Sequence, residues 1–166
     1  DIDPLIAAFG KIVLHQTSFG GFGARAGGPL GGRNQARAAY TVECRWKAPT
    51  LQRRVRWWSR HLRAAAITCR DFRDVFAHLP GNALLYIDPP YVLRGSQLYR
   101  HALSRADHDD LATILRRVER PWVLSYDDHP LIRDLYGGWA RLTSITFTYN
   151  GVHRKNQELI ITAREV

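Results

Sequence analysis

The chain has 166 residues, a formal net charge of +9 and 45% hydrophobic residues, which is enough apolar material for one ordinary domain. This composition excludes a disordered chain, a coiled coil and a collagen-like repeat. No stretch approaches the roughly 20 apolar residues of a membrane-spanning helix, and residues 1–4 lack the basic and apolar regions of a signal peptide. We therefore expect a single domain over residues 1–166 that makes no contact with a membrane.

The two cysteines, Cys44 and Cys69, lie far apart, with neither a CxxC motif nor a cluster of histidines beside them. A disulfide framework or a zinc site does not fit this pattern. We expect both cysteines to be buried free thiols, and we expect no metal ion.

The basic residues are 21 arginines and only three lysines, and the chain has no methionine. The planar fork of arginine suits phosphates and guanine edges, so a polyanionic partner is one interpretation. The alternative is that these arginines only cover a solvated surface, and composition leaves both interpretations open.

A glycine-rich loop is expected over about residues 19–37, because seven of the 13 glycines fall between Gly20 and Gly32. Aromatic and arginine side chains are interleaved in it: Phe19, Phe22, Arg25 and Arg33. Glycines let backbone amides approach a phosphate or a base closely, so we expect a mobile loop that contacts a ligand. A flexible linker is the alternative.

An arginine-rich helix is expected over about residues 50–65, with Thr50 as its N-cap. Apolar residues recur at helical spacing and predict a core face: Leu51, Val55, Trp58 and Leu62. Arginines occupy the remaining surface: Arg53, Arg54, Arg56, Arg60 and Arg63. They would lie against a nucleic acid backbone or be merely solvated.

The remaining elements alternate between strands and helices. We expect strands at 66–70, 84–87 and 122–126, helices at 73–78, 107–120 and 130–136, and a turn at 80–82. Two final strands, at 142–149 and 158–162, are expected to pair antiparallel. This order predicts an α/β protein, whose ligands bind at the carboxyl ends of the parallel strands.

The segment Asp88-Pro89-Pro90-Tyr91 follows directly after the apolar run at 84–87, which is typical of a buried parallel strand. Two successive prolines donate no amide hydrogen, so the carbonyls of this segment are left as acceptors in a fixed loop. A carboxylate and a nearby carbonyl can together accept both hydrogens of an exocyclic amino group, and Tyr91 offers a face for a flat base. An ordinary strand-ending turn with an exposed aspartate is the alternative.

Such an arrangement suits methyl transfer to adenine, whose amino nitrogen is a poor nucleophile because its lone pair is delocalised into the ring. Accepting its hydrogens at Asp88 and at the Pro89 carbonyl would favour a tetrahedral nitrogen and stabilise the positive charge that develops there.

The segment YIDPPY at 86–91, with the order of the motifs around it, resembles the Dam-type (D12 class) N6-adenine DNA methyltransferases. The resemblance runs along nearly the whole chain. It implies a Rossmann-like methyltransferase sheet, S-adenosylmethionine as cofactor, DNA as partner, and a cytoplasmic, nucleoid-associated location. It also implies that the catalytic residues are Asp88, Pro89, Pro90 and Tyr91.

Other segments extend this resemblance. DIDPLI at 1–6 resembles the acidic strand end that holds the ribose of the cofactor, which assigns that role to Asp1. CRDF at 69–72 implies that Asp71 and Phe72 lie near the cofactor adenine, with Asp88 also beside the cofactor. WVLSYDD at 122–128 and HRKNQELIIT at 153–162 fit later strands of the family. The expected DNA contacts are Phe19, Arg25, Arg33, Arg53, Arg56, Arg60 and Arg154.

The chain also departs from the family pattern. The family's glycine loop normally precedes the DIDPLI segment, so we expect an N-terminally incomplete sheet. TSFGGFGARAGG at 17–28 has Gly20 where asparagine is more usual. The stretch between the glycine-rich loop and Asp88 is too short for a sizeable target-recognition domain. We therefore expect the glycine-rich loop and the arginine-rich helix to recognise the DNA. Two alternatives stay open: a catalytically silent DNA-binding module, and an enzyme that methylates cytosine N4 or adenine in RNA.

Overall fold

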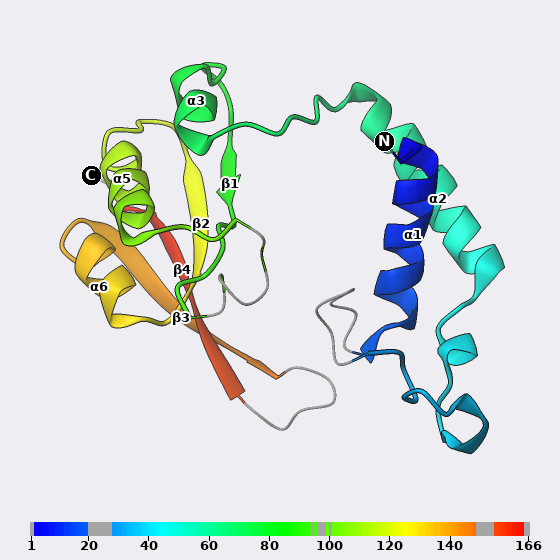
Figure 1. Ribbon diagram of the computed structural model, residues 1–166. Coiled ribbons are helices and arrows are strands. Elements are labelled where there is room, and N and C mark those ends of the chain that lie inside the picture. Colours follow the sequence, from blue (N-terminus) through cyan, green and yellow to red (C-terminus); the bar gives the residue numbers. More distant parts are fainter. Residues whose placement is uncertain are drawn as a thin grey trace. The chain divides into compact units, whose positions relative to one another are not determined.

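The computed structural model describes residues 2–19, 28–93, 95, 99, 101–148 and 155–164. Contacts divide the chain into two compact units, Asp1–Thr68 and Cys69–Val166 (Figure 1). A single domain over residues 1–166 stays a prediction. In the described part of the chain, no helix is both long and apolar enough to span a bilayer.

The first unit is helical. Helix α1 spans Pro4–Thr17, and the sequence analysis did not predict it. It begins there because the Asp3 carboxylate accepts bonds from the backbone N–H groups of Leu5, at 2.7 Å, and Ile6, at 3.4 Å. Pro4 suits the first turn, since its fixed φ is helical. Short 3-10 helices follow at Gln35–Arg37 and Val42–Cys44.

Helix α2 spans Ala48–His61 and continues into a 3-10 turn at Leu62–Ala64. The prediction of Thr50 as its N-cap is wrong: the cap is Lys47, and Pro49 lies in the first turn. The predicted core face is also wrong, since the helix buries no residue and Val55 and Trp58 are half exposed. Apolar residues at helical spacing predict a face, but its burial depends on a packing partner that the spacing does not reveal.

The glycine-rich loop is described from residue 28 onward, and Phe22 and Arg25 lie outside the described residues. Gln35 holds this part together: its Nε2 donates to the carbonyls of Leu30 and Gly32, and its Oε1 accepts from the N–H of Val42. Gly31 has φ +83°, and a Cβ there would collide with the Tyr40 carbonyl oxygen. Residues 28–42 therefore form a hydrogen-bonded turn and not an open loop.

The second unit is a mixed α/β layer. Its sheet has the order β1-β2-β4-β3, formed by Leu85–Ile87, Trp122–Asp127, Lys155–Ala163 and Ala140–Thr148. Strand β1 is parallel to β2, and β4 is antiparallel to both β2 and β3. The α/β class is thus confirmed.

Helices α3, α5 and α6 span Phe72–Ala77, Arg105–Leu115 and Pro130–Tyr136. Figure 1 shows them beside the sheet of this unit. The core joins Leu111 and Ile132 of α5 and α6 to Leu124 and Ile161 of the two central strands, and each of the four is at most 2% exposed. One face of the sheet therefore packs on helices, because alternate strand residues project to the same side.

Three further local predictions are wrong. Residues 66–70 belong to no strand. Leu84 and Tyr86 are 73% and 71% exposed, so the strand before Asp88 is buried on one face only. Both Cys44 and Cys69 are exposed, because each lies outside the helices and strands that build the core.

Candidate active site

The segment 88–91 begins where the sequence predicted, directly after a parallel strand. Ile87, the last residue of β1, pairs with Leu124 of β2. Asp88 therefore emerges at the carboxyl edge of the parallel pair, the edge at which α/β sheets bind ligands. Asp88 is exposed, and Tyr91 is half-buried.

Ser125 of β2 holds the Asp88 carboxylate. Its hydroxyl donates to Oδ1 of Asp88 at 2.8 Å and lies 3.4 Å from the carbonyl oxygen of Ile87. Ser125 is itself only 4% exposed. Within the described part of the chain, Oδ2 of Asp88 has no hydrogen-bond partner, so it can accept a hydrogen from a ligand.

Tyr91 is anchored by both its ring and its hydroxyl. The ring lies 6.0 Å from that of Tyr126, and the hydroxyl donates to Oε2 of Glu158 on β4 at 3.3 Å. Burial raises the pKa of the Tyr91 phenol, and the Glu158 and Asp88 carboxylates raise it further, against an opposing hydrogen bond with Ser125. The phenol therefore remains a protonated donor at neutral pH.

Asp127, at the end of β2, fixes the chain beyond Tyr91. Its carboxylate accepts from the backbone N–H groups of Val92, at 3.1 Å, and Leu93, at 2.9 Å. The N–H of Gly95 then donates to the Tyr91 carbonyl at 2.7 Å. Gly95 is buried against Pro90, and a Cβ at this position would lie 3.1 Å from the Pro90 Cβ.

Sequence reasoning missed four residues of this site: Ser125, Asp127, Glu158 and Gly95. An acidic residue at the end of an apolar strand was a usable signal for Asp127. Glu158 carried no such signal, because its position beside Asp127 depends on the pairing register of β2 with β4. Although three carboxylates lie around Tyr91, the described residues contain no group of three or more acidic, histidine or cysteine side chains that could hold a metal ion.

The candidate cofactor residues belong to a separate network. Asp71 caps α3, accepting from the backbone N–H of Arg73 at 2.8 Å. The Arg73 guanidinium lies 4.4 Å from the ring centroid of Phe72 and bonds to Asp107 and Asp110 of α5, at 2.6 and 2.7 Å. These carboxylates raise the pKa of Arg73, and Arg73 lowers that of Asp107. Asp71 and Phe72 thus have structural roles here, and Asp1 lies outside the described residues.

Most of the candidate DNA contacts belong to the first unit. Phe19 is 65% exposed, and four candidate arginines are also exposed: Arg33, Arg53, Arg56 and Arg60. Helix α2 has four arginines and no acidic residue among its 14 residues. Arg25 and Arg154 lie outside the described residues.

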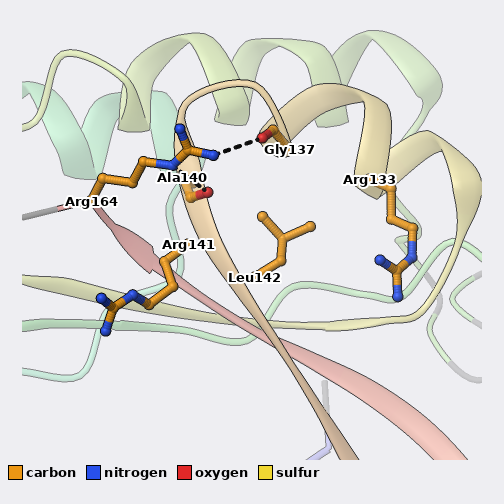
Figure 2. A pocket seen from close by; sticks show the side chains of 6 residues that line it. All are labelled: Arg133, Gly137, Ala140, Arg141, Leu142 and Arg164. Carbon is orange, nitrogen blue, oxygen red and sulfur yellow. Dashed lines mark hydrogen bonds between the residues drawn. The ribbon is translucent and has the colours of Figure 1, made fainter.

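A cavity of about 550 Å³ lies elsewhere in the second unit, lined by Arg133, Gly137, Ala140, Arg141, Leu142 and Arg164. Figure 2 shows Arg164 reaching back to the Gly137 and Ala140 carbonyl oxygens, at 3.2 and 3.3 Å. Ala140 starts β3 and pairs with Ala163 at the end of β4. Since β4 runs antiparallel to β2, this cavity lies at the edge of the sheet away from Asp88, and it is not the candidate site.

Comparison with known proteins agrees with this geometry. Residues 31–150, which include β1, segment 88–91 and β2, match the model of the D12 class N6 adenine-specific DNA methyltransferases. A DNA adenine methylase of Serratia marcescens is 28% identical over 102 residues, and the match covers 55% of this chain and 38% of that protein. The chain thus aligns with well under half of that relative. Because the family model covers most of the chain, the chain belongs to the D12 class N6 adenine-specific DNA methyltransferase family.

Proposed function

We propose that the chain transfers a methyl group from S-adenosylmethionine to the N6 amino group of adenine in DNA, with the target base flipped out of the duplex and held by Asp88, Pro89, Pro90 and Tyr91. The observation that carries the proposal is the Asp88 carboxylate at the carboxyl edge of β1. One of its oxygens is fixed by Ser125 and the other is open. Family membership supports the same reaction.

In this proposal Asp88 and Pro89 accept the two amino hydrogens of the adenine. The lone pair of the nitrogen then localises, and the carboxylate stabilises the positive charge that develops as the methyl group arrives. Tyr91 stacks against the base, and its hydroxyl stays on Glu158. When bound, S-adenosylmethionine would supply an electrophilic methyl group, whose transfer to the nitrogen would turn its sulfonium into a thioether and release one amino proton to water.

Two of the described residues could contact the adenosine part of the cofactor. Asp71 is half exposed, so its carboxylate can accept a further hydrogen bond from the adenosine. Phe72 already has Arg73 over its ring, which leaves it one face at most. We propose that these residues, with Asp88 and Asp1, contact the cofactor.

We propose further that the sheet is part of a Rossmann-like methyltransferase sheet. The parallel pair β1 and β2, joined through helix α5, supports this assignment. DNA would lie against the exposed arginines of α2, because phosphate contacts supply most of the non-specific affinity for DNA. We propose that Phe19, Arg25, Arg33 and Arg154 contact DNA as well.

The test is the Asp88→Ala variant of the full chain, assayed with labelled S-adenosylmethionine and duplex DNA. We expect methyl transfer to be abolished while DNA binding survives, because the carboxylate acts in the transition state and phosphates supply the affinity. Asp134→Ala is the matched control, since Asp134 is an exposed aspartate on α6. A variant at position 88 that keeps a tenth of the wild-type turnover would contradict the role of Asp88.

A further inference from the structure

We propose that Ser125 and Asp127 of β2 are positioning residues that hold the two ends of the loop Asp88-Pro89-Pro90-Tyr91. This inference rests on the proposed function, and it assigns roles that act through the loop and not on the substrate. Ser125 fixes the carboxylate at the start of the loop, and Asp127 fixes the backbone just after its end.

The strand places both anchors on the same side. Residues two apart on a strand project to one face, so Ser125 and Asp127 both face the loop. They are 4% and 9% exposed, although Asp88 itself is exposed. These two buried polar side chains form hydrogen bonds to residues in or directly after one loop, which indicates that the loop and the strand end form a single unit.

The residue between them locks the strand from its other face. Tyr126 is fully buried, its hydroxyl lies 2.7 Å from Nδ1 of His108 on α5, and its ring lies 6.4 Å from that of Tyr136 on α6. The end of β2 is therefore held by both helices. A rigid strand is a better support for a reacting group than a free loop, because small misplacements of such groups cost rate.

Each anchor has a distinct consequence for the reaction. The Ser125 hydroxyl occupies Oδ1 of Asp88, which leaves Oδ2 to accept the amino hydrogen. Asp127 satisfies two successive N–H groups that the turn after Tyr91 would otherwise leave unpaired. Two prolines precede this turn and offer no N–H groups of their own, so the side chain of Asp127 replaces the local backbone bonds that the loop lacks.

The test compares Ser125→Ala and Asp127→Asn in the full chain, with Ser144→Ala on β3 and Asp134→Asn on α6 as exposed controls. Asparagine keeps the size of aspartate but replaces one carboxylate oxygen with an NH2 group, which cannot accept. Because Val92 and Leu93 donate to different oxygens of Asp127, the substitution removes the acceptor of one of these two bonds. We expect at least one of the Val92 and Leu93 amides to exchange hydrogen at least about tenfold faster in Asp127→Asn, and both to exchange at the wild-type rate in Ser125→Ala.

The kinetic arm separates positioning from a merely structural role. We expect each of the two variants to lower kcat at least about tenfold while KM for DNA and for S-adenosylmethionine stays within about twofold, because the loop is misplaced only for the reacting geometry. Unchanged amide exchange in Asp127→Asn, or kcat within twofold of wild type in both variants, would overturn the proposal. Absence of methyl transfer in the wild-type chain would contradict the proposed function instead, and the exchange arm would then decide the positioning claim.

Discussion

Replacing Tyr91 separates the two parts of that side chain. Tyr91→Phe keeps the ring, which packs 6.0 Å from Tyr126, and removes the hydroxyl with its hydrogen bonds to Ser125 and Glu158. At 3.3 Å the bond to Glu158 is longer than the usual O–H···O distance, so its loss should cost about 0.5 to 1.5 kcal/mol, at the lower end of that range. Turnover should therefore fall by less than about tenfold.

Tyr91→Ala removes the stacking face as well. Base stacking on an aromatic ring is worth about 1 to 3 kcal/mol, which corresponds to about 5- to 150-fold in kcat/KM in addition to the loss of the hydroxyl. The assay is steady-state methyl transfer to duplex DNA, with the thermal unfolding of each variant recorded in parallel. Tyr86→Ala is the matched control, because Tyr86 lies on β1 and is 71% exposed.

An equal loss of activity in Tyr91→Phe and Tyr91→Ala would refute the reasoning, since it would place the essential interaction on the hydroxyl. A large loss in the Tyr86→Ala control would refute it too, because any tyrosine beside the loop would then matter. Burial holds the pKa of Tyr91 above its usual range, so the activity that depends on its hydroxyl should not titrate away below about pH 10.

Three further predictions concern DNA binding, pH and the core. Neutralising Arg53, Arg56 and Arg60 together should reduce the slope of log DNA affinity against log salt concentration by about three units. An unchanged slope would mean that these arginines of α2 do not contact DNA. Burial lowers the pKa of His108, so its contribution to stability is present above about pH 6.5 and is lost as pH falls through its lower folded pKa. The variant His108→Gln should therefore show a weaker pH dependence of the free energy of unfolding in urea over this pH range. An unaltered pH dependence would contradict the prediction. Leu124→Ala should lower the free energy of unfolding, measured in urea, by about 2 to 5 kcal/mol, whereas Leu84→Ala at an exposed position should lower it by less than about 0.5 kcal/mol. Similar losses in the two variants would contradict the position of the core.

Local signals in the sequence were sufficient for several elements. Helix α6 has the predicted bounds, 130–136, because Pro130 starts it and glycine follows it. Strand β1 and the loop after it were predictable because a short apolar run ends abruptly at Asp88. Helix α1 was missed although Asp3-Pro4 is a helix-start signal, since its apolar residues lie on all sides and Gly10 interrupts it.

Long-range pairing explains what the sequence could not predict in the site. Ser125 reaches Asp88 because β1 and β2 pair with Ile87 opposite Leu124, and Glu158 lies beside Asp127 because β4 pairs with β2 in one particular register. A shift of one residue would turn each of these side chains to the other face. Residues that lie 31 positions apart (Asp127 and Glu158) or 37 positions apart (Asp88 and Ser125) carry no local trace of such a register.

The central claim is that the amino nitrogen of adenine in DNA receives the methyl group. The most direct measurement incubates the full chain with methyl-labelled S-adenosylmethionine and unmethylated DNA, digests the DNA to nucleosides and identifies the labelled one by mass spectrometry. We predict label in N6-methyladenine nucleoside, and none when Asp88→Ala replaces the wild-type chain. Label in N4-methylcytosine, label only when RNA is supplied, or DNA binding without any transfer would contradict the claim.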